Sequence, residues 1–244
     1  MHKNPTQSTP TRSRGESAMH LTKTSCTRHT LSVLPAVVLL FATAASGALI
    51  GLNNASFENG NNSGFVTNFT DWSEEGNVYE QPDGNSNFPD APDGGSWLLL
   101  YEGDGSDAVY QQFGSFEANE QYDLTFTLGE RNDGSAPFEG VIFEVRANGG
   151  TTSDTLLATS GNILPTFTDH TFTDTITLTP DQGVVSEGTP LYLRIQGGDV
   201  GGTSRSDEVV DNLSMTDSII PEPASLLLLG LGGVAFLGRR NRRR

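Results

Sequence analysis

The stretch Tyr122-Asp-Leu-Thr-Phe-Thr-Leu128 alternates apolar and polar residues without interruption. Successive side chains of a β-strand point to opposite faces, so Tyr122, Leu124, Phe126 and Leu128 would share one face. The opposite face would carry only Asp and Thr side chains. This pattern predicts an antiparallel strand that packs one face on a core and turns the other toward water.

Similar short runs lie on both sides of this stretch, and clusters of Gly, Asn, Asp, Pro and Ser separate them. We predict strands at residues 97–101, 109–113, 122–128, 141–146, 172–178, 191–196 and 209–215. The run Trp97-Leu-Leu-Leu-Tyr101 is almost continuously apolar, and no segment has the period of a helix. Many short strands between turn residues predict an all-β sandwich, which we place at residues 49–218.

The charge of the 244-residue chain is distributed very unevenly around a net value of −16. Ten of the 14 Lys and Arg residues lie in the two terminal segments. Residues 48–218 contain 28 Asp and Glu against four Arg and no Lys, a net charge of −24. Such an acidic body repels phosphate groups, so we expect no nucleic-acid partner.

Residues 1–48 are predicted to be a signal peptide with a polar N-terminal extension. Lys23 and Arg28 precede an apolar run at residues 31–42, and the small residues 44–48 follow it. A basic segment, an apolar segment and small residues in this order are typical of export signals. The translation start is either Met1 or Met19. The single cysteine, Cys26, lies inside this segment, so the exported chain would contain no disulfide.

The C-terminal segment, residues 219–244, combines three features. Pro221, Glu222 and Pro223 come first, a Leu- and Gly-rich apolar run follows at residues 224–238, and five arginines end the chain. The apolar run is shorter than the roughly 20 residues of an ordinary membrane-spanning helix. The arginines would stay on the cytoplasmic side of a membrane. We therefore expect a short transmembrane helix that holds the exported body at the membrane.

This tail resembles the PEP-CTERM sorting signal, with Pro221, Glu222 and Pro223 as its sorting motif. The resemblance implies an exosortase-type membrane protease as a partner and a Gram-negative bacterium that makes exopolysaccharide. It also implies a protein that is anchored transiently in the inner membrane and then released to the cell surface or extracellular matrix.

Four segments of the body carry a second resemblance: Leu52-Asn-Asn-Ala-Ser-Phe-Glu-Asn-Gly60, Asp71-Trp72, the central runs between residues 93 and 131, and Val210-Asp-Asn-Leu-Ser-Met215. In these segments the body resembles jelly-roll sandwiches of the galactose-binding-like and carbohydrate-binding-module type. The resemblance implies a jelly-roll fold and an exported, non-catalytic surface or matrix protein, with exopolysaccharide or another glycan as the candidate ligand. The alternatives are a purely structural matrix protein without a small ligand and a secreted glycoside hydrolase.

Residues that would support catalysis are scarce in the body. His170 is its single histidine, and the body has no cysteine and no Gly-x-Ser-x-Gly sequence. These residues cannot supply a zinc site, and they give no support to a Ser-His-Asp triad. Carboxylate pairs for glycoside hydrolysis are plentiful, but no pair stands out. The sequence therefore leads us to expect that the protein is not an enzyme.

Three residues are candidates for ligand binding, namely Tyr79, Tyr101 and Arg131. Sugar sites combine an exposed aromatic ring with polar side chains that hold hydroxyl groups. The two tyrosines lie near predicted loops or strand ends, and Arg131 follows the strand that ends near residue 128.

The jelly-roll resemblance also implies one structural calcium ion where the first and last strands meet. The matching positions in this sequence are Glu58 and Asp211. Calcium takes about six to eight oxygen ligands, so two carboxylates would need backbone carbonyls and water to complete the site. We expect no other cofactor.

Overall fold

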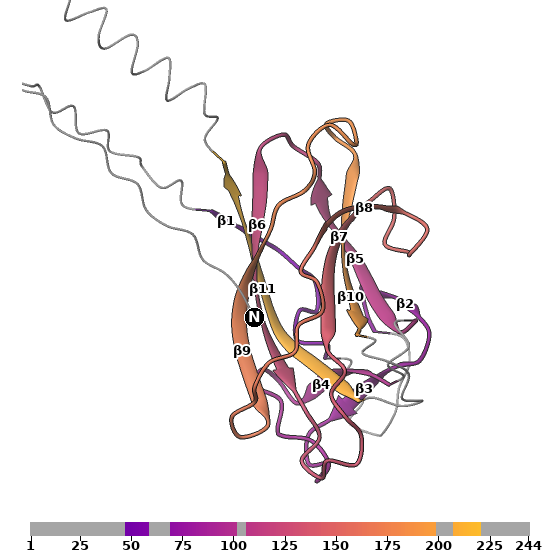
Figure 1. Cartoon of the computed structure of the whole chain (residues 1–244), viewed down its shortest axis with the longest axis vertical. Coiled ribbons are helices and arrows are strands. Elements are labelled where there is room, and N and C mark those ends of the chain that lie inside the picture. The colour runs from indigo at the N-terminus through magenta and orange to yellow at the C-terminus, as the bar shows by residue number, and fades with distance from the viewer. Residues whose placement is uncertain (1–46, 59–68, 102–105, 199–206, 221–244) are drawn as a thin grey trace, which may run out of the picture. The chain divides into compact units, whose positions relative to one another are not determined.

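The computed structural model describes residues 47–58, 69–101, 106–198 and 207–220, which fold into two antiparallel β-sheets (Figure 1). Sheet A has the strand order β3-β4-β11-β6-β9, and β1 also pairs with β11. Its strands are β1 (Ala48–Ile50), β3 (Val78–Pro82), β4 (Ser96–Leu100), β6 (Glu120–Gly129), β9 (Thr171–Leu178) and β11 (Glu208–Ile219). The predicted signal peptide and sorting tail lie outside the described residues.

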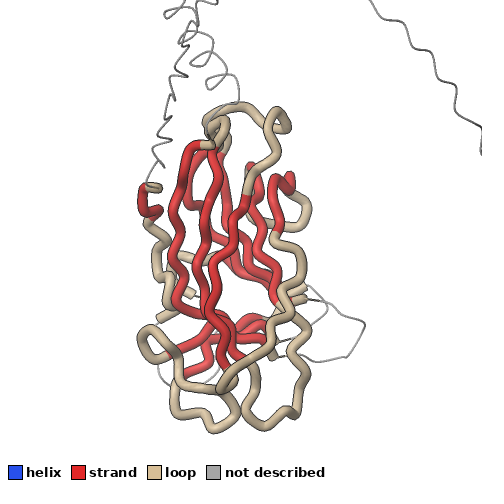
Figure 2. The backbone as a smooth tube through the Cα atoms, turned by 60° about the vertical axis from the view of Figure 1, so that its left-hand side comes forward, coloured by secondary structure: helices blue, strands red, loops and turns tan. Residues whose placement is uncertain are grey.

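Sheet B has the strand order β2-β5-β10-β7-β8. Its strands are β2 (Ser73–Glu75), β5 (Ala108–Ser115), β7 (Val141–Ala147), β8 (Thr155–Thr159) and β10 (Pro190–Gly197). Figure 2 shows strands and loops but no helix in the described part of the chain. Accordingly, the described residues include no helix that could cross a membrane.

The main hydrophobic core lies between the two sheets. The alternating side chains of β6 point into it, as the sequence predicts, and Leu124, Phe126 and Leu128 are completely buried. Sheet B contributes a matching face, and the rings of Phe126 and Phe143 pack with centroids 4.5 Å apart. Burial of these two apolar faces is the main force that holds the sheets together.

Strand β4 is buried on both of its faces, which explains its continuous apolar sequence. Leu98 and Leu100 face the main core, whereas Trp97 and Leu99 belong to a second cluster with Phe88 and Val209. This second cluster lies on the outer face of sheet A. The connection between β3 and β4, residues 83–95, packs on this cluster through Phe88 and through Pro89, whose carbonyl accepts the Trp97 indole N–H at 2.9 Å. We call this connection the strap.

The N-terminal turn docks on strand β11 where that strand contains a β-bulge between Asp211 and Ser214. The backbone N–H of Leu213 donates to the carbonyl of Ala55 at 3.1 Å. In the turn itself, the Asn54 side chain accepts the N–H of Glu58 at 2.7 Å. These bonds bring the beginning and the end of the sandwich together and place Glu58 beside β11.

The predicted all-β sandwich is confirmed in its two-sheet architecture; the more specific jelly-roll assignment stays a prediction. Each of the seven predicted strands is present, and β11 extends further than predicted, to Ile219. Strands β1, β2, β3 and β8 were not predicted. His170 lies in the turn before β9, with Nδ1 3.3 Å from Glu130 Oε1.

Candidate functional site

A cavity of about 130 Å³ lies at one end of sheet A, on its outer face. The strand register produces it, because Leu100 of β4 pairs with Glu208 of β11, and Gly129 of β6 pairs with Val209. The ends of β4 and β6 and the beginning of β11 therefore meet at the same edge. Side chains that follow or precede these strands, together with the strap, line the cavity.

Arg131 forms ion pairs with two carboxylates at this cavity. Its Nη1 donates to Oδ2 of Asp207 at 2.6 Å, and its Nε and Nη2 donate to the two oxygens of Asp133 at 2.8 Å. Asp207 is only 2% exposed, whereas Asp133 lies at the surface. Hydrogen bonds from Arg131 and the Ser135 backbone hold the pKa of Asp133 below its usual range. The same carboxylates raise the pKa of Arg131, so the guanidinium stays charged.

Aromatic rings form another part of the cavity. The guanidinium carbon of Arg131 lies 5.3 Å from the centroid of the Phe88 ring, within the range of a cation–π contact. Tyr101 lines the cavity, and Tyr79 packs edge-on against Tyr101 with ring centroids 5.5 Å apart. The structure thus brings the three predicted ligand residues together, although Tyr79 supports Tyr101 rather than lining the cavity.

Three carboxamides complete the lining: Gln81 from β3, and Asn85 and Asn87 from the strap. The strap is tied to the segment that follows β6, because the Asn132 N–H donates to the carbonyl of Asn87 at 2.8 Å. The cavity therefore offers hydrogen-bond donors and acceptors, flat aromatic walls and one buried carboxylate. Such a mixture is typical of sites for small organic molecules.

The structure also brings Glu58 and Asp211 together, at the opposite end of the strap. Oε1 of Glu58 accepts the N–H groups of Gly95 and Ser96 at 2.7 and 2.9 Å. Oδ2 of Asp211 accepts the N–H of Asp93 at 3.0 Å. Asp211 is completely buried, and its Oδ1 atom has no hydrogen-bond partner.

Burial raises the pKa of Asp211 to about 7, although hydrogen bonds from the backbone of Asn212 and Asp93 oppose the rise; the nearby carboxylates of Asp93 and Glu58 add to it. A buried carboxylate with an unpartnered oxygen is the kind of group that a cation would stabilise. Within the described ranges, however, no three Asp, Glu, His or Cys side chains converge into a metal cluster. The residues fit a calcium ion only if backbone carbonyls and water supply the remaining ligands.

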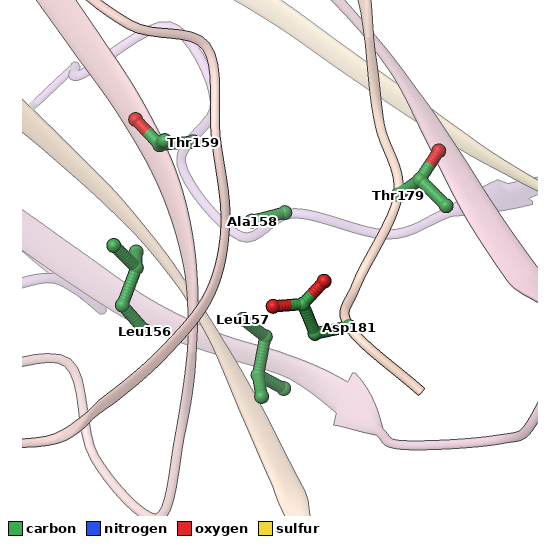
Figure 3. A pocket seen from close by; sticks show the side chains of 6 residues that line it. All are labelled: Leu156, Leu157, Ala158, Thr159, Thr179 and Asp181. Atoms are coloured by element: carbon green, nitrogen blue, oxygen red, sulfur yellow. The ribbon is translucent and has the colours of Figure 1, made fainter. Parts of the chain in front are cut away.

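A larger depression of about 290 Å³ lies beside the edge strand β8. Figure 3 shows the side chains of Leu156, Leu157 and Thr159 on one side and those of Thr179 and Asp181 on the other. Asp181 is the single charged residue in its lining, and no aromatic ring contributes. The smaller cavity at Arg131 carries more chemically useful groups, so we place the candidate site there.

The loop that follows β7 packs on part of the outer face of sheet B. Gly150 packs against the ring of Tyr110, and Nη1 of Arg194 donates to the Gly150 carbonyl at 3.0 Å. Arg146 Nη1 donates to the Asp154 carbonyl at 2.8 Å and fixes the same loop. Gly150 thereby lies against the partly exposed ring of Tyr110.

Sequence reasoning missed Asp207, Phe88 and the three carboxamides. Asp207 lies 76 residues from Arg131 in the chain, and only the pairing of β11 with β4 and β6 brings the two together. One signal was available, because Asp207 lies two residues before the last predicted strand, while Tyr101 and Arg131 lie at or shortly after the ends of two others. The carboxamides lie in or beside a turn-rich segment that carries no periodic pattern.

Comparisons with known proteins give two family matches. The family described as HpiC1 cyclase matches residues 48–210, and the PEP-CTERM protein-sorting motif matches residues 220–244. No curated protein matches the chain. The predicted PEP-CTERM motif is thus confirmed, and it implies export, a transient membrane-anchored stage and processing by exosortase, a membrane protein.

Several cyclase structures share the fold. A cyclase from Fischerella sp. TAU is 22% identical with a TM-score of 0.58, and the match covers 72% of this chain and 100% of that chain. A Stig cyclase from Fischerella sp. TAU, in complex with (3Z)-3-(1-methyl-2-pyrrolidinylidene)-3H-indole, is 20% identical with a TM-score of 0.57 over the same shares. A cyclase from this organism in complex with 4-(1H-indol-3-yl)butan-2-one is 21% identical with a TM-score of 0.57. This match also covers 72% of this chain and 100% of that chain.

The expectation that the protein is not an enzyme is wrong, because the family that matches most of the body is that of a cyclase. That expectation rested on the scarcity of histidine and cysteine in the body. Ring closure can instead depend on substrate positioning and a carboxylic acid, which leave no such motif. The expected glycan partner gains no support from these matches.

Proposed function

The chain belongs to the HpiC1 cyclase family, and on this premise we propose that it is an exported cyclase whose reaction takes place in the Arg131 cavity. The observation that carries this proposal is the buried ion pair between Arg131 and Asp207, 2.6 Å long, inside an aromatic-lined cavity. An ion pair in such a place provides a proton-transfer group and a fixed charge next to it.

Ring closure joins two atoms of one substrate, so the first task of the site is to hold the substrate in a folded conformation. Tyr101 provides a flat wall for this purpose and packs edge-on against Tyr79, while Phe88 supports Arg131 from below. The carboxamides of Asn85 and Asn87 can orient polar groups of the substrate through hydrogen bonds. Each of these residues binds or positions the substrate without taking part in bond formation.

The second task is to move a proton, and Asp207 is the carboxylate in the cavity that can do so. Arg131 stabilises the negative charge of Asp207 when the proton is on the substrate. Asp133 fixes the far side of the guanidinium with two hydrogen bonds and thereby orients it toward Asp207. We assign Asp207 as the catalytic residue and Arg131 as the group that holds its charge.

Aromatic compounds of the indole class are the first substrates to test. Two of the Fischerella cyclase structures are complexes with indole compounds. The partly exposed ring of Tyr101 could stack on a flat ring system of this kind. The purified protein is incubated with a panel of 3-substituted indoles, and mass spectrometry and NMR detect products that have the same mass and an additional ring.

We propose in addition that Glu58 and Asp211 hold one structural calcium ion. The support is the unpartnered, buried Oδ1 atom of Asp211 beside the carboxylates of Glu58 and Asp93. A bound calcium ion would neutralise this concentration of negative charge. Because the turn that carries Glu58 docks on β11, the ion would also connect the two ends of the sandwich.

A further inference from the structure

The short strand β1 covers the edge of β11 near the end of that strand. Ala48 pairs with Asp217, and Ile50 pairs with Met215. Strand β4 pairs with residues 208–210 of β11, on the side that faces away from β6, so β1 takes over this edge after β4 has ended. Without β1, this part of β11 would present unpaired backbone groups. The beginning of the body is therefore tied to its last strand.

The backbone nitrogen of Ala48 is held by a carboxylate. Its N–H donates to Oδ1 of Asp217 at 2.8 Å. Ala48 is exposed, so a positive charge on this nitrogen would stay in contact with water and would not carry the cost of burial. The position thus suits an ammonium group at least as well as an amide N–H, because a charged donor strengthens a hydrogen bond to a carboxylate.

Asp217 belongs to a group of acids at this end of the sandwich. Burial raises the pKa of Glu120, a hydrogen bond from Tyr122 opposes the rise, and the charges of Glu117 and Asp217 add to it. The Tyr122 hydroxyl donates to Oε2 of Glu120 at 2.8 Å, and burial together with these acids raises its pKa, so it stays neutral. The arginines within the described ranges form ion pairs with other carboxylates, namely Arg131, Arg146 and Arg194. A positive charge at Ala48 would reduce the repulsion among the acids.

The bond between Gly47 and Ala48 lies in the small-residue segment that ends the predicted export signal. Ala45 and Gly47 occupy the third and first positions before this bond, where the cleavage of export signals requires small residues. The match to the cyclase family also begins at residue 48. Both lysines of the sequence, Lys3 and Lys23, precede this bond. A chain that begins at Ala48 would therefore contain a single amine, which is its own N-terminus.

We propose that a signal peptidase cuts the chain between Gly47 and Ala48, and that the new N-terminal ammonium of Ala48 forms an ion pair with Asp217. The step is a hydrolysis in which water adds to the Gly47 carbonyl carbon and the bond to the Ala48 nitrogen breaks. Gly47 leaves as a carboxylate, and the Ala48 nitrogen takes up the protons to become an ammonium. The ion pair then joins the first residue of the exported chain to the strand that leads into the sorting tail. The predicted signal peptide accordingly ends at residue 47 rather than at residue 48.

The first test identifies the N-terminus of the exported protein. The full-length chain is produced in its native host, the exported protein is isolated, and its free amine is acetylated with an isotope-labelled reagent. Mass spectrometry of its peptides then identifies the residue that carries the label. We expect the label on Ala48. A label on any other N-terminal residue would overturn the cleavage site and, with it, the ion pair.

The second test is a titration of this amine in the folded exported protein. The rate of labelling is measured against pH, because only the uncharged amine reacts. Its pKa should be roughly half a unit to one unit higher in the parent protein than in Asp217→Asn, because the carboxylate stabilises the ammonium. Asp174→Asn is the matched control; it removes an exposed acid from β9, at the far edge of sheet A, and should keep the parent pKa. Equal pKa values in the parent and in Asp217→Asn would overturn the ion pair but leave the cleavage site in place.

Discussion

Arg131 links an exposed carboxylate, Asp133, to a buried one, Asp207. Replacement of Arg131 by Met would leave Asp207 buried without its positive partner. Removal of one member of a buried ion pair costs about 3–5 kcal/mol, so we expect a loss of this size in the free energy of unfolding. Urea denaturation measures it. Asp133→Asn is the control and should have little effect, because exposed ion pairs contribute little; equal losses in the two variants would contradict the assignment.

The pH dependence of stability should reveal the raised pKa of Asp211. Its pKa is raised from 3.8 to about 7, so the folded chain binds this proton more tightly than the unfolded chain does. Between about pH 4 and pH 7, the calcium-free protein should therefore lose stability as the pH rises, with little further change above pH 7 from this group.

Thermal unfolding in chelator at several pH values measures this loss. In Asp211→Asn, the loss should shrink and the calcium-free protein should be more stable at pH 8, because no charge remains to be buried. Calcium should raise the melting temperature of the parent protein but not of this variant. An identical pH profile in both proteins would show that Asp211 is not the group responsible.

At the level of elements, two glycines of the strap provide a matched pair. Gly94 and Gly84 both have positive φ, of 83° and 78°, and differ in their surroundings. A Cβ atom at Gly94 would overlap the Glu58 carboxylate, whereas a Cβ atom at Gly84 would meet nothing within 4 Å. Both Ala variants carry the backbone penalty of about 1–3 kcal/mol.

Gly94→Ala should therefore destabilise the protein more than Gly84→Ala does, and the excess measures the contact with Glu58. It should also weaken the response of the melting temperature to calcium, whereas Gly84→Ala should leave this response unchanged. Equal effects of the two substitutions on both quantities would argue against a strap that is held by Glu58.

A strand could be predicted from the sequence only where its own side chains show the apolar pattern of a strand. β6 alternates cleanly and β4 is buried on both faces, so both are visible in the sequence. β2 consists of Ser, Glu and Glu, and it is a strand only because β5 supplies its hydrogen bonds. The same limit applies to the site, because Asp207 meets Arg131 only through the register of β11, which no local pattern of residues encodes.

For the whole molecule, the sorting motif leads to a prediction about the mature chain. Residues 220–244 match the PEP-CTERM motif, which implies processing by exosortase. We expect protein released from its native host to end near Pro221–Pro223 and to lack the five C-terminal arginines. Mass spectrometry of the intact released protein measures this directly. A terminus at Arg244 in every fraction would contradict the prediction.

The central claim is that the body is a cyclase with Asp207 as its catalytic residue. The most direct measurement is the conversion of 3-substituted indoles by the purified protein, by Asp207→Asn and by Asp181→Asn. Asp181 lies in the depression beside β8, away from the Arg131 cavity, and serves as the control. We predict ring-closed products of unchanged mass from the parent protein and from the control. In Asp207→Asn the rate should fall by about 100-fold or more, the usual contribution of a positioned acid–base group. Unchanged turnover in a folded Asp207→Asn protein would contradict the claim.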